Sequence, residues 1–210
     1  MNSYIENLNW RYATKKFDTN KKVSHQDLEL LKDVIQLSAS SYGLQPYKVL
    51  LIEDKETRKK LQVAAWGQSQ ITESSHLFVF ANNTNFNDSH IDTYIQNVSK
   101  TRNLNIEDLK GYADFMKSKI SPLTSQAKEN WTAKQSYIAL GNLLSAAAFL
   151  KIDACPMEGF EADAINKILD LEKAGFKTTF LVTIGYRSKD DQTQHYPKVR
   201  TPKTELFTTI

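Results

Sequence analysis

The segment from Trp131 to Phe160 constrains the fold more than any other part of the chain. Its first part, Trp131 to Leu150, has helical character and is apolar or small on almost every side, and its last part is Pro156-Met157-Glu158-Gly159-Phe160. A helix that is apolar all round is usually buried in a large core or at a subunit interface. Pro156 cannot continue a helix, and Gly159 lets the backbone turn or approach a ligand closely. The segment predicts a buried helix that ends in a tight turn, which is one way to build a floor for a flat cofactor. A helix that serves only as core fits it equally well.

Composition and charge exclude several classes of protein. The 210 residues are 40% hydrophobic and 24% charged, which is typical of a globular chain, and the net charge of +3 is too small to indicate a nucleic-acid partner. A membrane span is not expected, because Lys134, Gln135 and Asn142 interrupt the apolar run before the roughly 20 residues that a bilayer requires. The single Cys155 excludes an internal disulfide. With no secretory signal pattern at the start, we expect a cytoplasmic protein.

Hydrophobic periodicity predicts an α+β fold. Strands are predicted at 47–53, 76–81 and 178–186, with the last two paired. Helices are predicted at 3–12, 25–37, 55–66 and 162–171, with two amphipathic helices inside 84–122 and the central helix starting after the cap-like pair Ser121-Pro122. Loops are predicted at 38–46 and 67–71. No repeat or linker divides the chain, so residues 1–210 are predicted to form one domain, with a helical excursion at about 84–122 and an extended tail from about 187 to 210.

Familiar catalytic patterns are missing from the sequence. There is no Gly-x-Ser-x-Gly elbow, no His-Glu-x-x-His or paired-cysteine spacing for a metal, and neither of the glycine-rich phosphate loops. The four histidines carry no signature and are predicted to be surface residues or satisfied structural ones. We therefore expect no protein-bound metal, no nucleophilic triad and no dinucleotide-binding βαβ unit.

A distributed anion site remains possible. Arg11 and Lys15 lie near one end of the chain, and Lys198 and Arg200 lie near the other. A phosphomonoester carries about −1.5 to −2 charges at pH 7, and arginine can bind it with two parallel hydrogen bonds. The alternation in Lys198-Val199-Arg200 places both cations on one side of an extended segment. A basic tail that only aids solubility is the alternative.

Four separated blocks occur in a characteristic order. They are Arg11-Tyr-Ala-Thr-Lys-Lys-Phe17, Ser38-Ala-Ser-Ser-Tyr-Gly-Leu-Gln-Pro46, Pro156-Met-Glu-Gly-Phe160 and Pro197-Lys-Val-Arg-Thr-Pro202, with Lys134-Gln135 in the central helix. On these blocks the chain resembles the FMN-dependent nitroreductase family, including the oxygen-insensitive nitroreductases and their dihydropteridine-reductase relatives, over about residues 2–205. The resemblance implies a mixed sheet wrapped by helices and an intertwined homodimer formed through the long central helix. It also implies FMN at the subunit interface and a tail that embraces the partner subunit.

The resemblance also implies roles for single residues. Arg11, Lys198 and Arg200 fall on phosphate-binding positions, and Ala13 falls where many relatives carry a serine, so that only its backbone can help. Lys15 matches the lysine at the polar edge of the isoalloxazine ring, and Glu158 belongs to the turn that covers the ring with a backbone N–H directed at N5. Lys15 and Glu158 are the predicted catalytic residues. The full predicted cofactor-binding set is Arg11, Tyr12, Ala13, Lys15, Ser40, Ser41, Gly43, Gln70, Gln135, Pro156, Met157, Glu158, Gly159, Lys198 and Arg200.

Some residues depart from the family pattern. Tyr42-Gly43-Leu44 replaces the small polar Thr-Asn-Ser of well-known members, and Gln70 stands where relatives carry an asparagine. The loop at 67–73 is shortened and lacks the basic residue that often meets the nicotinamide dinucleotide, so the choice between NADH and NADPH stays open. The excursion varies within the family, and its Tyr112, Phe115 and Met116 are candidates either for a lid or for plain core.

The resemblance implies an oxidoreductase. NADH or NADPH would give a hydride to flavin N5, and a nitroaromatic, quinone or similar planar acceptor would then take the electrons. Two alternatives stay open from the sequence: a flavin-binding protein without turnover, and a reductase of the same fold that acts on pteridines or halogenated aromatics.

Overall fold

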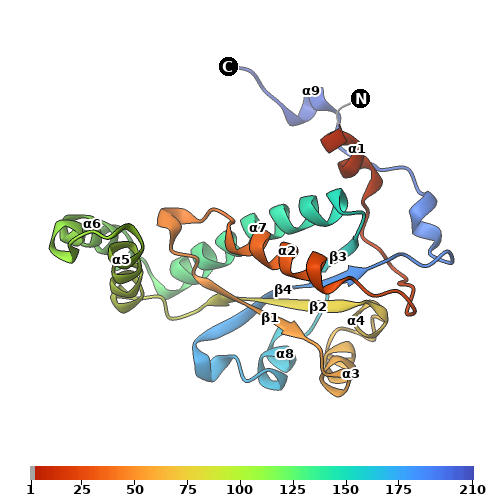
Figure 1. Cartoon of the computed structure of the whole chain (residues 1–210), viewed down its shortest axis with the longest axis horizontal. Coiled ribbons are helices and arrows are strands. Elements are labelled where there is room, and N and C mark those ends of the chain that lie inside the picture. Colours follow the sequence, from red (N-terminus) through yellow and green to blue (C-terminus); the bar gives the residue numbers. More distant parts are fainter. Residues whose placement is uncertain (1–2) are drawn as a thin grey trace.

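A four-stranded antiparallel sheet lies at the centre of the structure, which is a computed structural model that describes residues 3–210 (Figure 1). The strands are β1 (Tyr47–Ile52), β2 (His76–Asn83), β3 (Asp153–Met157) and β4 (Phe176–Gly185), in the spatial order β1-β2-β4-β3. β2 and β4 are the inner strands and are almost continuously buried, which explains why their sequences read as apolar runs. The predicted pairing of these two strands is confirmed.

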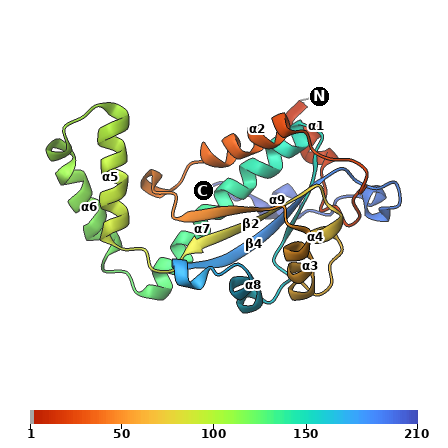
Figure 2. The same ribbon diagram turned by 60° about the horizontal axis from the view of Figure 1, so that its bottom comes forward.

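Helices cover both faces of the sheet (Figures 1 and 2). One face packs against α2 (His25–Gln36) and α7 (Ser125–Phe149), and the other against α3 (Lys55–Ala64), α4 (Gln70–Glu73) and α8 (Ala162–Ile168). Neighbouring side chains of a strand point to opposite faces, so Phe78 joins the first core and Leu77 the second. The sheet thus separates two apolar cores.

The central helix begins later than the sequence suggested. Ser121 is the C-cap of the preceding helix, and its N–H donates to the carbonyl of Lys117. Thr124 is the N-cap of α7 and accepts a hydrogen bond from the backbone of Ala127. The predicted start at Ser121-Pro122 is therefore wrong, because Ser121 still belongs to the end of the previous helix.

α7 is buried on one side only. Its buried side includes Ala139, Leu143 and Ala147 in the first core, whereas its other side leaves apolar side chains exposed. Ile138 is 43% exposed and Phe149 is 70% exposed. The prediction of a buried helix therefore holds for half of its circumference within this chain.

Two helices form an arm that projects from one end of the sheet (Figures 1 and 2). They are α5 (Asp88–Arg102) and α6 (Lys110–Ile120), and they enclose a small core of their own. The core consists of Phe86, Ile91, Ile95, Ala113, Met116 and Ile120. These are the amphipathic helices predicted inside 84–122.

The segment after α7 differs from its prediction. Pro156 and Met157, predicted as part of a turn, lie in β3 and pair with β4. A proline is tolerated there because β3 is an edge strand, where a missing N–H breaks no ladder on the outer side. The mixed character expected of the sheet is confined, within residues 3–210, to one parallel bridge between Ala13 and Ala154.

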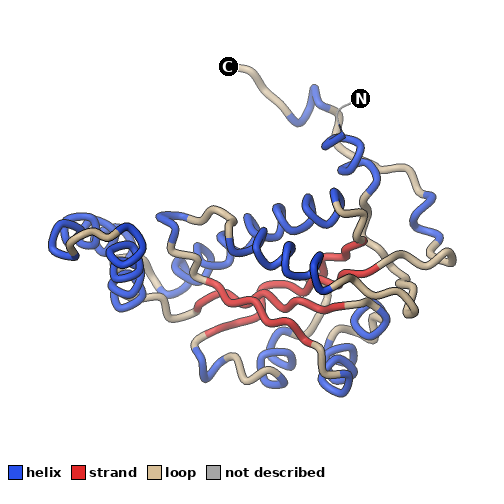
Figure 3. Tube along the Cα trace, in the orientation of Figure 1, coloured by secondary structure: helices blue, strands red, loops and turns tan. Residues whose placement is uncertain are grey.

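Short elements complete the chain. α4 begins at Gln70 inside the predicted 67–71 loop, and the tail after β4, mostly loop in Figure 3, contains two short helices. The remaining elements are α1 (Ser3–Trp10), η1 (Ser41–Gly43), η2 (Ile106–Leu109), η3 (Glu172–Ala174), η4 (Gln192–His195) and α9 (Lys203–Leu206). In the described part of the chain, no helix combines the length and apolarity needed to cross a bilayer.

A buried arginine holds the connection between α4 and β2. Arg58 is 7% exposed, and its guanidinium donates to the carbonyls of Ile71 at 2.6 Å and Ser74 at 2.8 Å. It also donates to the Ser74 hydroxyl at 2.6 Å. These groups are buried with the cation, so each would lose its partner if the guanidinium were removed.

We expect Arg58→Met to lower the free energy of unfolding by about 3 kcal/mol, because buried carbonyls left without donors cost about 1–3 kcal/mol each. Urea denaturation measures this change. Lys59→Met is the matched control, since Lys59 makes only an exposed ion pair with Glu56 and should cost less than about 1 kcal/mol. Equal losses for the two variants would contradict this account of Arg58.

Candidate functional site

The two ends of the chain meet beside β3. The backbone N–H of Asp18 donates to the Tyr186 carbonyl at 2.8 Å, and that of Ser188 donates to the Lys16 carbonyl at 2.9 Å. Phe17 and Arg187 form an antiparallel bridge between these bonds. The segment that carries Arg11 and Lys15 is thereby fixed next to the start of the tail.

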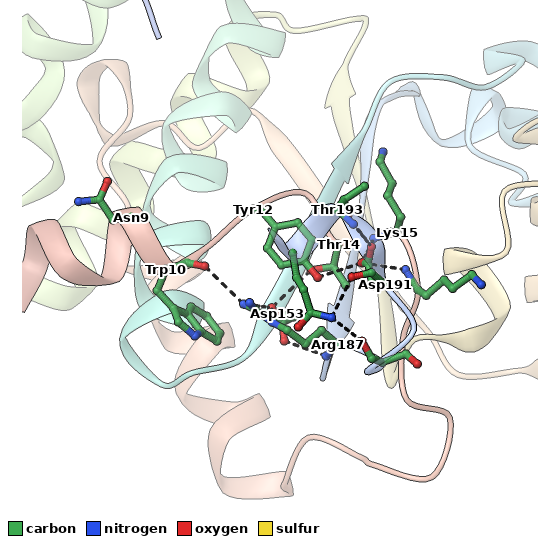
Figure 4. A network of polar contacts seen from close by, with 12 residues as sticks. Asn9, Trp10, Tyr12, Thr14, Lys15, Asp153, Arg187, Asp191 and Thr193 are labelled. Carbon is green, nitrogen blue, oxygen red and sulfur yellow. Dashed lines mark hydrogen bonds and ion pairs between the residues drawn. The ribbon is translucent and has the colours of Figure 1, made fainter. Parts of the chain in front are cut away.

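A buried carboxylate, Asp191, lies at the centre of this junction (Figure 4). It is 2% exposed and accepts hydrogen bonds from the Tyr12 hydroxyl at 2.9 Å and from the Lys15 and Lys16 backbone at 2.8 and 3.1 Å. It also accepts from the Thr193 backbone at 3.0 Å. Burial alone would raise the pKa of Asp191, but the hydrogen bonds from Thr193, Lys15, Lys16 and Tyr12 outweigh it and hold this pKa at about 2.

A second buried carboxylate anchors the same junction from β3. Asp153 accepts the Arg187 Nε at 2.8 Å and the Arg187 backbone N–H at 2.8 Å. The Arg187 guanidinium lies between two aromatic rings, 4.2 Å from the centroid of Trp10 and 4.6 Å from that of Tyr12 (Figure 4). Such cation–π contacts favour a fixed position of the ring and of the arginine, so the path of residues 10–12 is set by β3.

Three cations converge next to this junction. Burial lowers the pKa of Arg11, and the positive charge of Arg200 lowers it further. Partial desolvation likewise lowers the pKa of Lys198, followed by the charges of Arg11 and Arg200. Lys198 Nζ donates to the Asn9 carbonyl at 2.6 Å. Within residues 3–210, no carboxylate forms a salt bridge with any of the three, so their repulsion favours a bound anion.

Lys15 and Gln70 both lie near Cys155 of β3. Both act on the thiol of Cys155, whose pKa is raised by burial and lowered by the charge of Lys15, by a hydrogen bond with Gln70 and by the charge of Arg11. Ala13 lies in the parallel bridge to the neighbouring Ala154. The structure thus places Arg11, Ala13, Lys15 and Gln70 around β3.

The end of β3 continues into the predicted turn. The Met157 side chain is buried in the second core, so only its backbone faces outward. The Gly159 carbonyl accepts Gln68 Nε2 at 2.7 Å, and a Cβ on Gly159 would lie 2.8 Å from a ring atom of Trp66. Glu158 accepts the Tyr137 hydroxyl at 2.7 Å, and burial and this hydrogen bond raise the pKa of Tyr137. This contact joins the turn to the exposed side of α7.

The remaining predicted residues form a second group at η1. The backbone N–H of Ser41 donates to Gln135 Oε1 at 2.7 Å, and the Ser40 hydroxyl accepts the Gln45 N–H at 2.9 Å. Gly43 has a φ of 77°, in the region that favours glycine.

α7 separates this second group from the turn and from the cations. Gln135 and Tyr137 are two residues apart, and their side chains therefore point about 200° apart around the helix. The far end of α7 lies by α1, where Lys151 Nζ binds Asn7 at 2.6 Å. That contact lies just past the end of α7, about 24 Å along the helix direction from Gln135. One chain therefore does not bring Ser40, Ser41, Gly43 and Gln135 to the cations.

Sequence reasoning missed the two buried carboxylates and Arg187. An aspartate in a polar tail is normally exposed, and nothing near Asp153 marks an ion pair. The available signal was the spacing Asp191-x-Thr193, which is typical of a residue that caps a short helix; Asp191 is indeed the cap of η4.

Ionised Asp191 should stabilise the fold only above acid pH. Its pKa is about 2 in the folded protein against the ordinary 3.8, so its contribution is complete above pH 5 and is lost as the pH falls toward 2. We expect the difference in unfolding free energy between the wild type and Asp191→Asn to shrink by about 2 kcal/mol from pH 5 to pH 2. Asp190→Asn, which removes a carboxylate from an exposed neighbour, is the matched control. Urea titrations at each pH measure these differences, and a gap for Asp191→Asn that does not change with pH would contradict the assignment.

Comparison with known proteins identifies the same family that the sequence resembles. The nitroreductase family model matches residues 8–186. A Staphylococcus saprophyticus protein provisionally named an NAD(P)H nitroreductase is 35% identical over 210 residues, covering 96% of this chain and 94% of that protein. The structure of YdfN from Bacillus subtilis, provisionally named a nitroreductase, has a TM-score of 0.89 at 21% identity and covers 99% of both chains. A provisionally named nitroreductase from Exiguobacterium sibiricum, solved in complex with FMN, has a TM-score of 0.83 at 21% identity, over 99% of this chain and 97% of that one. The chain belongs to the nitroreductase family.

Proposed function

We propose that this protein is an FMN-dependent NAD(P)H oxidoreductase that works as a homodimer, with the whole chain acting as one FMN-binding domain. The observation that carries the proposal is the convergence of Arg11, Lys198 and Arg200 from opposite ends of the sequence, with no carboxylate paired to them within residues 3–210. Three such cations fit the phosphate of FMN, because guanidinium and ammonium groups bind phosphate oxygens with charge-assisted hydrogen bonds. The FMN complex of the Exiguobacterium protein supports the same choice of ligand.

The other residues of this group suit the ring of the flavin. Lys15 would stabilise the negative charge that develops at the polar edge of the ring on reduction. Gly159 lies at the turn expected to cover the ring, and within residues 3–210 its N–H makes no hydrogen bond. It is therefore free to donate to the flavin. Bound FMN would supply the hydride chemistry, and the protein would supply orientation and charge.

A second copy of the chain would complete the site. Ser40, Ser41, Gly43 and Gln135 lie across α7 from the cations, so they can serve the same flavin only from another subunit. The exposed side of α7 offers the surface, because it carries Ile138 and Phe149 and borders a cavity of about 480 Å³. The cavity is lined by Tyr4, Val34, Leu37, Asn142, Ser145, Ala146 and Phe149. Apolar surface of this kind marks an interaction site.

The acceptor would be planar. Tyr42, next to the η1 serines, packs edge-on against Phe115 of α6 with ring centroids 6.3 Å apart, which would place an aromatic wall beside the flavin in the dimer. Nitroaromatics and quinones suit such a wall. Pteridines and halogenated aromatics suit it as well, and the choice between NADH and NADPH and the cytoplasmic location stay predictions.

The phosphate assignment is tested by the double variant Lys198→Ala, Arg200→Ala. Each lost charge-assisted hydrogen bond is worth about 1.5–3 kcal/mol, so we expect the dissociation constant for FMN to rise at least about a hundredfold. Flavin fluorescence titration measures the constant. Lys203→Ala removes a cation from α9 of the same tail and should leave it unchanged. Unaltered FMN affinity in the double variant would disprove the assignment.

Turnover is tested by adding NADH or NADPH to the flavin-loaded protein without oxygen. Bleaching of the flavin absorbance and its return on addition of a nitroaromatic or quinone is the expected result. A yellow protein that neither donor bleaches would be a flavin-binding protein without turnover.

The dimer is tested by Ile138→Asp, which places a charge on the exposed side of α7. We expect the variant to be monomeric in analytical ultracentrifugation and to bind FMN at least about tenfold more weakly, because burying an unpaired carboxylate at the interface is unfavourable. Val63→Asp alters a side chain on α3 that is also exposed and should leave assembly intact. A dimeric Ile138→Asp protein with normal FMN affinity would rule out this interface.

A further inference from the structure

We propose that Asp191 is a positioning residue for the flavin phosphate: its carboxylate holds the segment that carries Arg11 and Lys15 against the tail that carries Lys198 and Arg200. This inference rests on the proposed FMN-binding function. It assigns a role to a residue that lies outside the predicted cofactor-binding set and that acts through its neighbours.

The two oxygens of the carboxylate bind two different parts of the chain (Figure 4). Oδ2 accepts from the Tyr12 hydroxyl at 2.9 Å, the Lys15 N–H at 2.8 Å and the Lys16 N–H at 3.1 Å. Oδ1 accepts from the N–H and the hydroxyl of Thr193 in η4. One oxygen therefore fixes residues 12–16, and the other fixes the start of η4 within the tail.

The cations of the phosphate site flank these contacts in the sequence. Arg11 directly precedes Tyr12, and Lys198 follows Thr193 by a few residues. The tail has few other attachments at this point: residues 195–200 are exposed, and Lys198 reaches back only to the Asn9 carbonyl. Because the three cations repel one another, the two segments would tend to separate without a tie between them. Asp191 supplies that tie.

The Tyr12 side chain has a structural role in addition to the predicted place of this residue at the cofactor. Its hydroxyl donates to Asp191, and its ring packs on the Arg187 guanidinium, so neither is free for the cofactor. The backbone N–H groups of Lys15 and Lys16 are occupied in the same way. Lys15 is therefore left to act through its ammonium group alone.

The direction of the change in FMN affinity distinguishes a positioning role of Asp191 from a purely electrostatic one. A carboxylate near a phosphate site repels the phosphate, so removing its charge without moving any cation would strengthen FMN binding. If Asp191 positions the cations, the same change weakens FMN binding. Asp191→Asn is the informative variant, because the amide has nearly the same shape but turns an NH₂ group toward donors that need an acceptor.

The experiment compares FMN with riboflavin, which has the same ring and no phosphate. Fluorescence titrations of the full-length protein give the ratio of the dissociation constant for riboflavin to that for FMN, which reports phosphate recognition alone. We expect Asp191→Asn to lower this ratio at least about tenfold, the loss of one charge-assisted contact. Asp190→Asn removes an equal charge from the exposed residue next to Asp191. This control should leave the ratio unchanged.

Two milder variants test the proposal if Asp191→Asn does not fold. Tyr12→Phe removes one donor to Oδ2, and Thr193→Val removes one donor to Oδ1, while both keep the carboxylate. Each should lower the ratio by about two- to fivefold. A ratio that is unchanged or raised in the folded variants, or equal weakening of riboflavin and FMN, would overturn the proposal. A wild-type protein that binds neither flavin would instead overturn the proposed function.

Discussion

The candidate site depends on the closure of the chain's two ends beside β3. Residues 16–18 and 186–188 are joined by backbone hydrogen bonds, and Ala13 bridges to Ala154 in the same place. The entropy cost of closing a loop grows only slowly with its length, and most of this loop is already ordered by the sheet, because β4 ends one residue before the junction. A few hydrogen bonds and two buried carboxylates are therefore enough to hold together cations that repel one another.

α7 connects the two groups of predicted site residues. Its buried side forms core with β2 and β4, and its Gln135 accepts a hydrogen bond from the Ser41 backbone that fixes the loop at η1. Its exposed side carries Tyr137, which binds Glu158 at the turn after β3. One helix thus sets the position of both groups of predicted residues while keeping them apart within a chain, which is the arrangement that the proposed dimer requires.

The sequence predicted the inner strands well, because buried runs such as Leu77 to Ala81 leave little choice of structure. It failed where two local signals compete. Ser121 and Thr124 both look like helix caps, and only the hydrogen bond from Ser121 to Lys117 decides between them. β3 was missed because Pro156 suggests a turn unless the strand is known to lie at an edge. The pattern of cations suggested an anion site and the resemblance to a family assigned them to a phosphate, whereas Asp191 was not found, because most of the donors that bury it, from Tyr12, Lys15 and Lys16, lie far away in the sequence.

Pro156 also has a consequence for how the molecule behaves in concentrated solution. An uncovered sheet edge offers a row of N–H and C=O groups on which a foreign strand can grow, and this is a common route to fibrous aggregates. On the outer side of β3 the bridge from Ala13 covers one position, and the proline ring removes a donor two residues later. The edge next to Arg11, Lys198 and Arg200 is thereby a poor template for a foreign strand.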